Sequence, residues 1–348
     1  MRCPSININI NKVWQATCLG AICCAGSAAS WGCASCGCTL SADAAAGYSA
    51  LPGFRLTFEY DYINQDQLRR GTGTATPAEV VNNPTIPDSN GGEIEKQTIN
   101  RYITLGLSYT PDPNWNIDLV VPYVDRSHTT YGVQEQPYTP AETARDQISG
   151  ARFAELGDIK LIGSWQGLLA HNLGLQLGLK LPTGHYGTAV KFDSGPNAGE
   201  PLDASLQPGT GSTDVIVGAY YYQAISQDFD AFVNGQFQSA VSHKMNQPGN
   251  DFRPGNLETV SFGLRYEAHP DWVPQLQVNL THKSPDQGAL ADLPDTAGTV
   301  AYLSPGVTLR AFGPLHLFAF VQVPVYSNLV GYQVFPRWTA SAGGAYAF

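Results

Sequence analysis

The chain has 348 residues, a formal net charge of −10 and only 14% charged residues, well below the roughly 25% of an average soluble domain. The acidic balance argues against a basic nucleic-acid-binding protein, so no nucleic-acid partner is expected. No stretch approaches the roughly 20 consecutive apolar residues of a membrane-spanning helix, which excludes a helical membrane protein.

The first segment has the parts of a secretory signal. Arg2 and Lys12 form a basic region, and Val13–Cys24 is an apolar run too short to span a bilayer. Small residues follow, with Ala29 as the expected cleavage position. We therefore expect residues 1–29 to be a signal peptide and the mature chain to be exported. The alternative is a buried N-terminal helix.

Three cysteines follow the expected cleavage position at once, Cys33, Cys36 and Cys38, and no cysteine follows Cys38. Thiolates in this Cys-x-x-Cys-x-Cys pattern can hold a soft metal ion or cluster, although tetrahedral zinc needs a fourth ligand. A disulfide with one spare thiol is the plainer interpretation. We expect residues 30–52 to be a Cys-rich periplasmic segment and a candidate plug. No other cofactor is expected.

The cysteine pattern also resembles, loosely, the N-terminal Cys-x-x-Cys of the barrel component in porin–cytochrome electron conduits. That resemblance implies a periplasmic redox partner. The chain contains no Cys-x-x-Cys-His motif, so a haem would have to come from that partner.

From residue 53 onward, apolar and polar residues alternate with period two. Because successive side chains of a strand point to opposite faces, each such segment is expected to be a strand with one apolar and one polar face. The clearest segments are 54–62, 103–109, 115–123, 173–181, 276–280 and 315–323.

The connections between these segments alternate in length. Short turns are expected at 110–114, 169–172, 225–228, 269–272 and 312–314. Long polar connections are expected at 66–96, 127–155, 185–211, 242–255, 285–298 and 327–335. Short turns at one end and long loops at the other are typical of outer-membrane barrels. The prediction is an all-β protein: residues 53–348 form a transmembrane antiparallel β-barrel of about 12 strands with periplasmic termini, in the bacterial outer membrane. A soluble secreted β-protein is the alternative.

The last segment supports this interpretation. Trp338, Tyr346 and the final Phe348 lie on the apolar parity. Outer-membrane barrels commonly end on such a strand with a terminal aromatic residue.

The polar faces carry charges that a soluble sandwich could not bury but a water-filled lumen could hold. The candidate lumen residues are Asp118, Lys160, Lys180, Asp214, Asp230, Arg265, Arg310, Phe318 and Phe320. Inward aromatic rings would suit an aromatic or hydrophobic solute. The same rings could instead simply fill a narrow barrel.

Three motifs carry a resemblance to a family. They are Leu156-Gly157-Asp158-Ile159, the Leu-Lys-Leu-Pro-Thr-Gly run 179–184 and the Leu-Gln-Pro-Gly-Thr-Gly-Ser-Thr-Asp run 206–214. They resemble the outer-membrane family associated with the MetA-pathway of phenol degradation. The resemblance implies a porin-like barrel and uptake of aromatic or other hydrophobic compounds. From the residues themselves, the motifs mark strand–loop junctions.

The leading functional prediction is a porin-like channel that passes small solutes, with outer-membrane lipid and a small-molecule solute as partners. The alternative is a barrel scaffold of an envelope redox or metal complex built on the cysteines. A distant third is an outer-membrane lipid hydrolase, suggested by His282-x-Ser284. No orienting Asn follows on the next segment, so no catalytic residue and no enzyme activity are expected.

Overall fold

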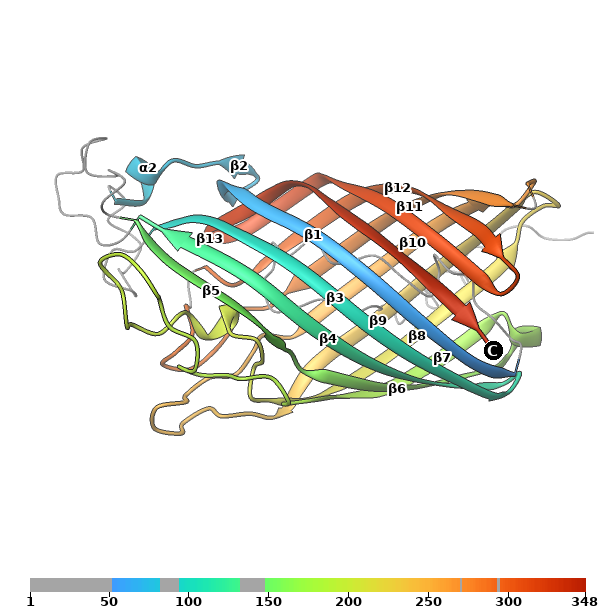
Figure 1. Cartoon of the computed structure of the whole chain (residues 1–348), viewed down its shortest axis with the longest axis horizontal. Helices are drawn as coiled ribbons and strands as arrows, with labels where there is room; N and C mark the ends of the chain where they lie inside the picture. The colour runs from blue at the N-terminus through green and yellow to red at the C-terminus, as the bar shows by residue number, and fades with distance from the viewer. Residues whose placement is uncertain (1–51, 82–93, 132–147, 270, 293–294) are drawn as a thin grey trace, which may run out of the picture.

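The computed structural model describes residues 52–81, 94–131, 148–269, 271–292 and 295–348. These residues form a closed antiparallel β-barrel (Figure 1). Its elements are, in chain order, β1 (Gly53–Gly71), β2 (Gly73–Thr74), α2 (Pro77–Val81), β3 (Glu95–Asp112), β4 (Trp115–Thr130), β5 (Ser149–Leu156), β6 (Ile159–Leu168), the 3₁₀ turn η3 (Leu169–His171), β7 (Leu173–Leu181), the 3₁₀ turn η4 (Ala204–Leu206), β8 (Thr213–Ala224), β9 (Phe229–Ser242), β10 (Leu257–Tyr266), β11 (Trp272–Lys283), β12 (Gly298–Phe312) and β13 (Leu315–Ala347).

Two irregularities decide how many spans of the chain make up the barrel wall. β5 and β6 lie end to end along β4 and make one crossing. β13 pairs with β12 up to Leu329 and then with β1 from Leu329 onward, antiparallel to each. It therefore reverses near Gly331, whose φ is 69°. With the two arms of β13 counted separately, the wall has twelve crossings, as predicted. In place of the long connection expected at 327–335, the two arms of β13 meet in a tight reversal near Gly331.

The barrel closes where the two ends of the described chain meet. The Phe54 N–H donates to the Phe348 carbonyl at 2.9 Å, and the Phe348 N–H donates to the Phe54 carbonyl at 2.8 Å. The Phe54 ring stacks on Phe348 at 5.8 Å and on Tyr109 at 4.6 Å between centroids. Closure leaves no open sheet edge between β1 and β13. Lipid could not supply hydrogen bonds to the backbone groups of such an edge.

Deleting Phe348 should weaken this closure. The change removes two backbone hydrogen bonds and one ring stack, which together contribute about 1–3 kcal/mol. The deletion variant should lose its heat-resistant gel mobility at a lower temperature than the wild type. The Phe348→Ala variant keeps the backbone bonds and should lie between the two. Equal transitions for all three proteins would contradict this view of closure.

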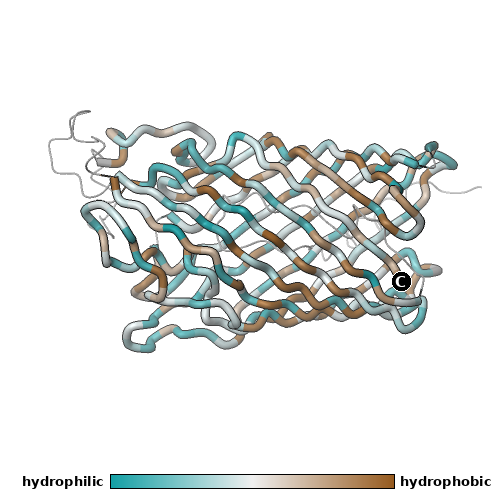
Figure 2. The backbone as a smooth tube through the Cα atoms, viewed as in Figure 1, coloured by the Kyte–Doolittle hydropathy of each residue, from teal (hydrophilic) through white to brown (hydrophobic). Residues whose placement is uncertain are grey.

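The outer face carries an apolar band. Outward side chains along the strands are large and exposed, among them Phe58 on β1, Leu177 on β7 and Leu276 on β11. Figure 2 shows hydrophobic residues distributed along the middle of the strands. Aromatic pairs lie near both ends of this band, such as His269 with Trp272 at the short-turn end and Tyr62 with Trp338 nearer the loops. The arrangement is that of a lipid-facing surface.

The described part of the chain contains no helix both long and apolar enough to cross a membrane.

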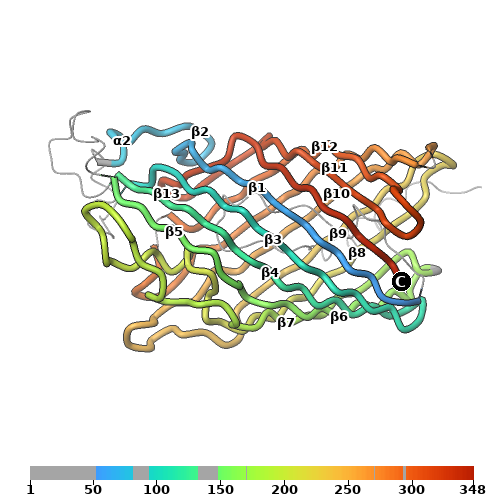
Figure 3. The backbone as a smooth tube through the Cα atoms, viewed as in Figure 1, coloured from blue at the N-terminus to red at the C-terminus, as the bar shows by residue number. Residues whose placement is uncertain are grey.

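Short turns and long loops lie at opposite ends, as predicted. The C-terminus lies at the short-turn end, and the longer connections gather at the other (Figures 1 and 3). The longest connection in the described residues, 182–212, turns back on the barrel. It covers the free edge of β5, where the Asp193 N–H donates to the Gly150 carbonyl at 2.9 Å and the Gly150 N–H donates to the Ser194 carbonyl at 3.1 Å. This pairing protects an edge that β7 leaves open by ending at Leu181.

Candidate functional site: the barrel lumen

The inward faces of the strands carry most of the residues predicted for the lumen. Seven of the nine are buried: Asp118, Lys160, Lys180, Asp214, Arg265, Phe318 and Phe320. Asp230 is half-buried and accepts a hydrogen bond from the Tyr222 hydroxyl. Arg310 is exposed at the short-turn end, where it forms an ion pair with Glu267 at 2.8 Å.

A buried ionic cluster lies on the inner side of the wall, where β6, β7 and β8 meet the 182–212 connection. The Lys180 ammonium lies 3.0 Å from Asp158 Oδ2 and 3.2 Å from Asp214 Oδ2. All three side chains are 6% exposed or less. Register places Lys180 of β7 directly opposite Lys160 of β6 and opposite Asp214 of β8. The cluster therefore cross-links three neighbouring strands.

The three sequence motifs of the predicted strand–loop junctions meet at this cluster. Asp158, from the first motif, accepts hydrogen bonds from the Gly184 N–H at 3.1 Å and the Thr210 N–H at 3.0 Å. The Ser212 hydroxyl donates to Asp214 Oδ1 at 2.6 Å. A side chain at Gly209 would place its Cβ 2.5 Å from Asp158 Oδ1, so this approach requires glycine. The motifs thus satisfy the hydrogen bonds of a buried charge network as well as turning the chain.

Inward aromatic rings lie against glycines on the adjacent strand. Phe232 is the register partner of Gly263, and Phe320 is the register partner of Gly306. A Cβ added at Gly263 or Gly306 would fall 2.0 and 2.1 Å from the respective ring. Tyr220 lies in the same way against Gly174. These rings therefore line the wall closely, an arrangement that only glycine partners allow.

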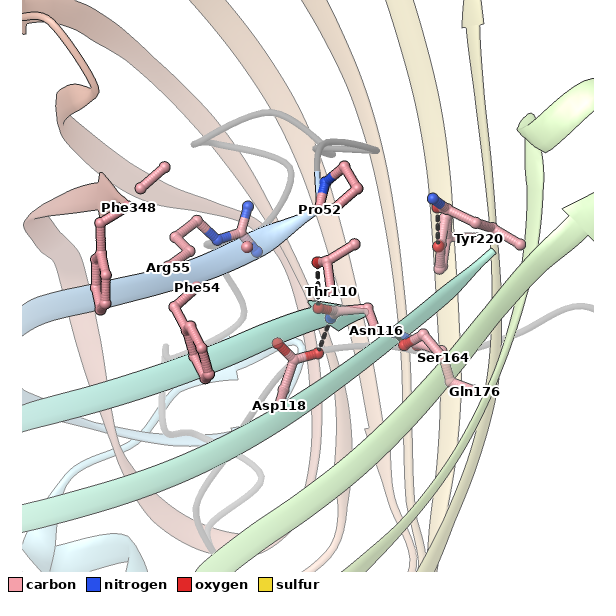
Figure 4. A pocket seen from close by; sticks show the side chains of 13 residues that line it. Pro52, Phe54, Arg55, Thr110, Asn116, Asp118, Ser164, Gln176, Tyr220 and Phe348 are labelled. Atoms are coloured by element: carbon pink, nitrogen blue, oxygen red, sulfur yellow. Dashed lines mark hydrogen bonds between the residues drawn. The ribbon is translucent and has the colours of Figure 1, made fainter. Parts of the chain in front are cut away.

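A cavity of about 240 Å³, lined by polar and apolar residues, lies at the short-turn end (Figure 4). The Thr110 hydroxyl donates to Asn116 Oδ1 at 3.1 Å, and the Asn116 amide donates to Asp118 Oδ2 at 2.6 Å. Across the cavity, the Tyr220 hydroxyl donates to Gln166 Oε1 at 2.7 Å. This end of the lumen offers hydrogen-bonding groups to a solute or to water.

The loop end of the lumen holds an apolar cluster instead. Ile63, Tyr102 and Val124 point inward from β1, β3 and β4, and they pack with Phe192 and Leu206 of the 182–212 connection. The connection therefore places apolar side chains inside the barrel. Lumen-facing positions of porins are usually polar, so this cluster sets the loop end apart.

Arg126 of β4, which was not among the predicted lumen residues, holds that connection in place. Its guanidinium donates to Asn100 Oδ1 at 2.5 Å, to the Leu206 carbonyl at 2.5 Å and to the Tyr102 hydroxyl at 2.8 Å. Arg126 lies two residues after Val124, so the period-two alternation places both side chains on the inner face. This was the feature of the sequence that could have identified Arg126. The partner carbonyl of Leu206, 80 residues away in sequence, could not be foreseen from the pattern.

The outer rim next to this cluster is acidic. The side chains of Glu95, Asp203, Asp292 and Asp295 line one small pocket together with Tyr332. Burial, together with the nearby Asp292 carboxylate, raises the pKa of Asp295 from 3.8 to about 7. The Tyr332 N–H donates to Asp295 Oδ1 at 2.6 Å and opposes this shift.

The rim should therefore be less stable at high pH. The folded state holds a proton on Asp295 that the unfolded chain releases near pH 3.8, so stability falls as pH rises from about 4 to about 7. The protection factors of the rim amides around Tyr332, which correct hydrogen-exchange rates for the intrinsic effect of pH, should be lower at pH 8 than at pH 5. The Asp295→Asn variant should lose this dependence, whereas Asp228→Asn on an exposed short turn should retain it. A pH dependence that survives in Asp295→Asn would refute the assignment.

Several predictions concern residues outside this site. Cys33, Cys36 and Cys38 lie outside the described residues, as do the signal peptide 1–29 and nearly all of segment 30–52, so these stay predictions. Within the described residues, no group of three or more His, Cys, Asp or Glu side chains could hold a metal ion. His282 hydrogen-bonds the Thr299 hydroxyl at 2.8 Å, and this contact does not build a serine–histidine pair.

Comparison with known proteins supports the fold. No family model and no curated protein matches the chain. A solved outer-membrane channel from Pseudomonas putida F1 superposes with a TM-score of 0.56 at 12% identity and covers 86% of this chain and 98% of that one. Weaker matches include the toluene transporter TbuX of Ralstonia pickettii and the β domain of the Bordetella autotransporter BrkA. Their TM-scores are 0.43 and 0.45, their identities are both 10%, and they cover 86% of this chain and 90% and 100% of their own.

The closed wall, the lipid-facing band and this similarity define the class of protein. The chain is a β-barrel of the bacterial outer membrane.

Proposed function

We propose that this barrel is a channel for small hydrophobic or aromatic solutes. The observation that carries the proposal is the apolar cluster inside the loop end, where Phe192 and Leu206 pack against inward side chains of the wall. A lumen for sugars or ions would need water-solvated polar groups at that entrance, whereas an apolar solute can replace the contacts that these side chains make.

The rest of the lumen is consistent with this proposal. Aromatic side chains at Tyr220, Phe232 and Phe320 are buried and pack against glycines on the inner face of the wall. Polar groups follow toward the short-turn end, where the cavity of about 240 Å³ contains Asn116 and Asp118. A solute would thus pass from an apolar to a polar environment on its way to the periplasm.

The proposal is tested with the purified protein in lipid vesicles and planar bilayers. Vesicles with the protein should take up benzyl alcohol faster than empty vesicles. The protein-dependent rate, which is the rate with protein minus the rate of empty vesicles, should be larger for benzyl alcohol than for the small polar solute erythritol. Discrete current steps in planar bilayers would establish an aqueous path in addition. Uptake equal to that of empty vesicles, from protein that still shows the gel shift of a folded barrel, would refute a channel.

A further inference from the structure

A second cavity, of about 50 Å³, lies beside the buried ionic cluster. A single water needs roughly 10–15 Å³ measured in this way, so the cavity has room for a few waters or for one small headgroup. Lys160, Arg126 and Lys283 line it together with Val124, Pro208 and Leu257. The lining therefore combines charged and apolar side chains.

Lys160 differs from the other charges around this cavity. It is 4% exposed, and its ammonium has one neutral partner, Gln238 Oε1, at 3.3 Å. In the described residues no carboxylate lies within the 4 Å of an ion pair with it. Burying an ammonium without a counter-charge is costly, so the position calls for an anionic partner.

The neighbouring carboxylates are already engaged. Asp158 and Asp214 both contact Lys180, and Asp214 Oδ2 also accepts the Gln238 amide at 2.6 Å. Lys283 is satisfied by Asp286 at 2.8 Å. Lys160 also lies directly opposite Lys180 in the register, and like charges facing each other across strands repel. Around the cavity four cations, Arg126, Lys160, Lys180 and Lys283, face three carboxylates, Asp158, Asp214 and Asp286.

The apolar lining of the cavity continues into the loop-end cluster. Val124 belongs to both, and Arg126 hydrogen-bonds the Leu206 carbonyl of that cluster. A ligand that places an anionic group at Lys160 can therefore extend an apolar body along Val124. Such a ligand is amphipathic, with a small acidic head.

We propose that Lys160 binds the carboxylate of a small solute with an apolar body, such as an aromatic acid. This inference rests on the proposed channel function and specifies its solute class. The carboxylate would occupy the cavity beside Lys160 and complete its missing ion pair.

The test is equilibrium dialysis of the full chain in a non-ionic detergent with benzoate, benzyl alcohol or acetate. Benzoate should bind more tightly than benzyl alcohol, which lacks the charge, and more tightly than acetate, which lacks the ring. The Lys160→Met variant should bind benzoate about tenfold more weakly or worse, the loss typical of a hydrogen bond to a charged group. Its affinity for benzyl alcohol should be unchanged.

Two further variants keep the test decisive. Lys191→Met makes the same change at an exposed lysine and should bind benzoate as the wild type does. Lys160→Arg retains the charge and should retain most benzoate binding, and it serves if Lys160→Met does not fold. Equal binding of benzoate and benzyl alcohol by the wild type, or unchanged benzoate binding in Lys160→Met, would overturn the proposal.

The proposed channel and the proposed Lys160 site are tested by different measurements, so either can fail without the other. Vesicle uptake of benzyl alcohol tests passage without requiring the Lys160 site. Uptake without Lys160-dependent benzoate binding would overturn this site alone, and Lys160-dependent binding without uptake would overturn the channel alone.

Discussion

Replacing Lys180 by methionine is expected to lower the free energy of unfolding by about 3–5 kcal/mol. The substitution keeps the length of the side chain but leaves Asp158 and Asp214, both nearly fully buried, without the ammonium that lies 3.0 and 3.2 Å from them. Both buried carboxylates then lose the ion pair that each makes with Lys180. Urea unfolding of the protein in micelles, followed by tryptophan fluorescence, measures the loss.

A surface pair provides the matched control. Arg337 contacts Asp66 at 3.1 Å, but both side chains are largely solvated, so Arg337→Met should change stability by less than about 1 kcal/mol. The triple variant Lys180→Met, Asp158→Asn, Asp214→Asn removes both carboxylates together with the ammonium that they contact, so much of the stability should return. If Lys180→Met unfolds at the wild-type urea concentration, the cluster does not hold the three strands together.

Replacing Gly306 by valine should also be costly. The new Cβ would fall 2.1 Å from the Phe320 ring, which is 2% exposed and has little room to move. Overpacking of this kind typically costs about 1–3 kcal/mol. The unfolding midpoint in urea should fall accordingly, because the Phe320 ring must move away from β12 and displace its neighbours.

The same substitution elsewhere separates overpacking from loss of glycine itself. At Gly163 the nearest atom to an added Cβ is the Leu177 carbonyl oxygen, 3.8 Å away, so Gly163→Val should be tolerated. Truncating the ring in the double variant Gly306→Val, Phe320→Ala should remove the steric conflict and give less destabilisation than the two single changes added together. Strict additivity would show that Gly306 and Phe320 do not act as a pair.

The candidate site was predictable where it depends on the parity of a strand. Lys180 lies on the polar face of the 173–181 alternation, and the structure buries it on the inner face of β7. Its counter-ions could not be assigned, because Asp158 and Asp214 are 22 and 34 positions away and their approach depends on strand register. The prediction that the motifs around them mark strand–loop junctions was correct but missed their shared charge cluster.

Loop behaviour was harder to foresee than strand behaviour. The 182–212 connection is polar and rich in glycine and proline, which predicts a solvated outer loop. The structure instead buries its Phe192, Leu202 and Leu206 inside the barrel and anchors Leu206 to Arg126. The connection at 327–335 was expected to be a long loop, yet the chain reverses tightly near Gly331 within β13.

By itself, the sequence determined that the chain forms a membrane β-barrel. Alternation at period two assigns each side chain to the lipid or the lumen, and the turn lengths show which end of the barrel carries the short turns and which the long loops. These are local properties, so they can be read along a single strand. Only the tertiary structure decided which inward side chains meet. The rung of Lys160, Lys180 and Asp214 depends on the register of three strands, and register is a property of the closed sheet rather than of any one segment.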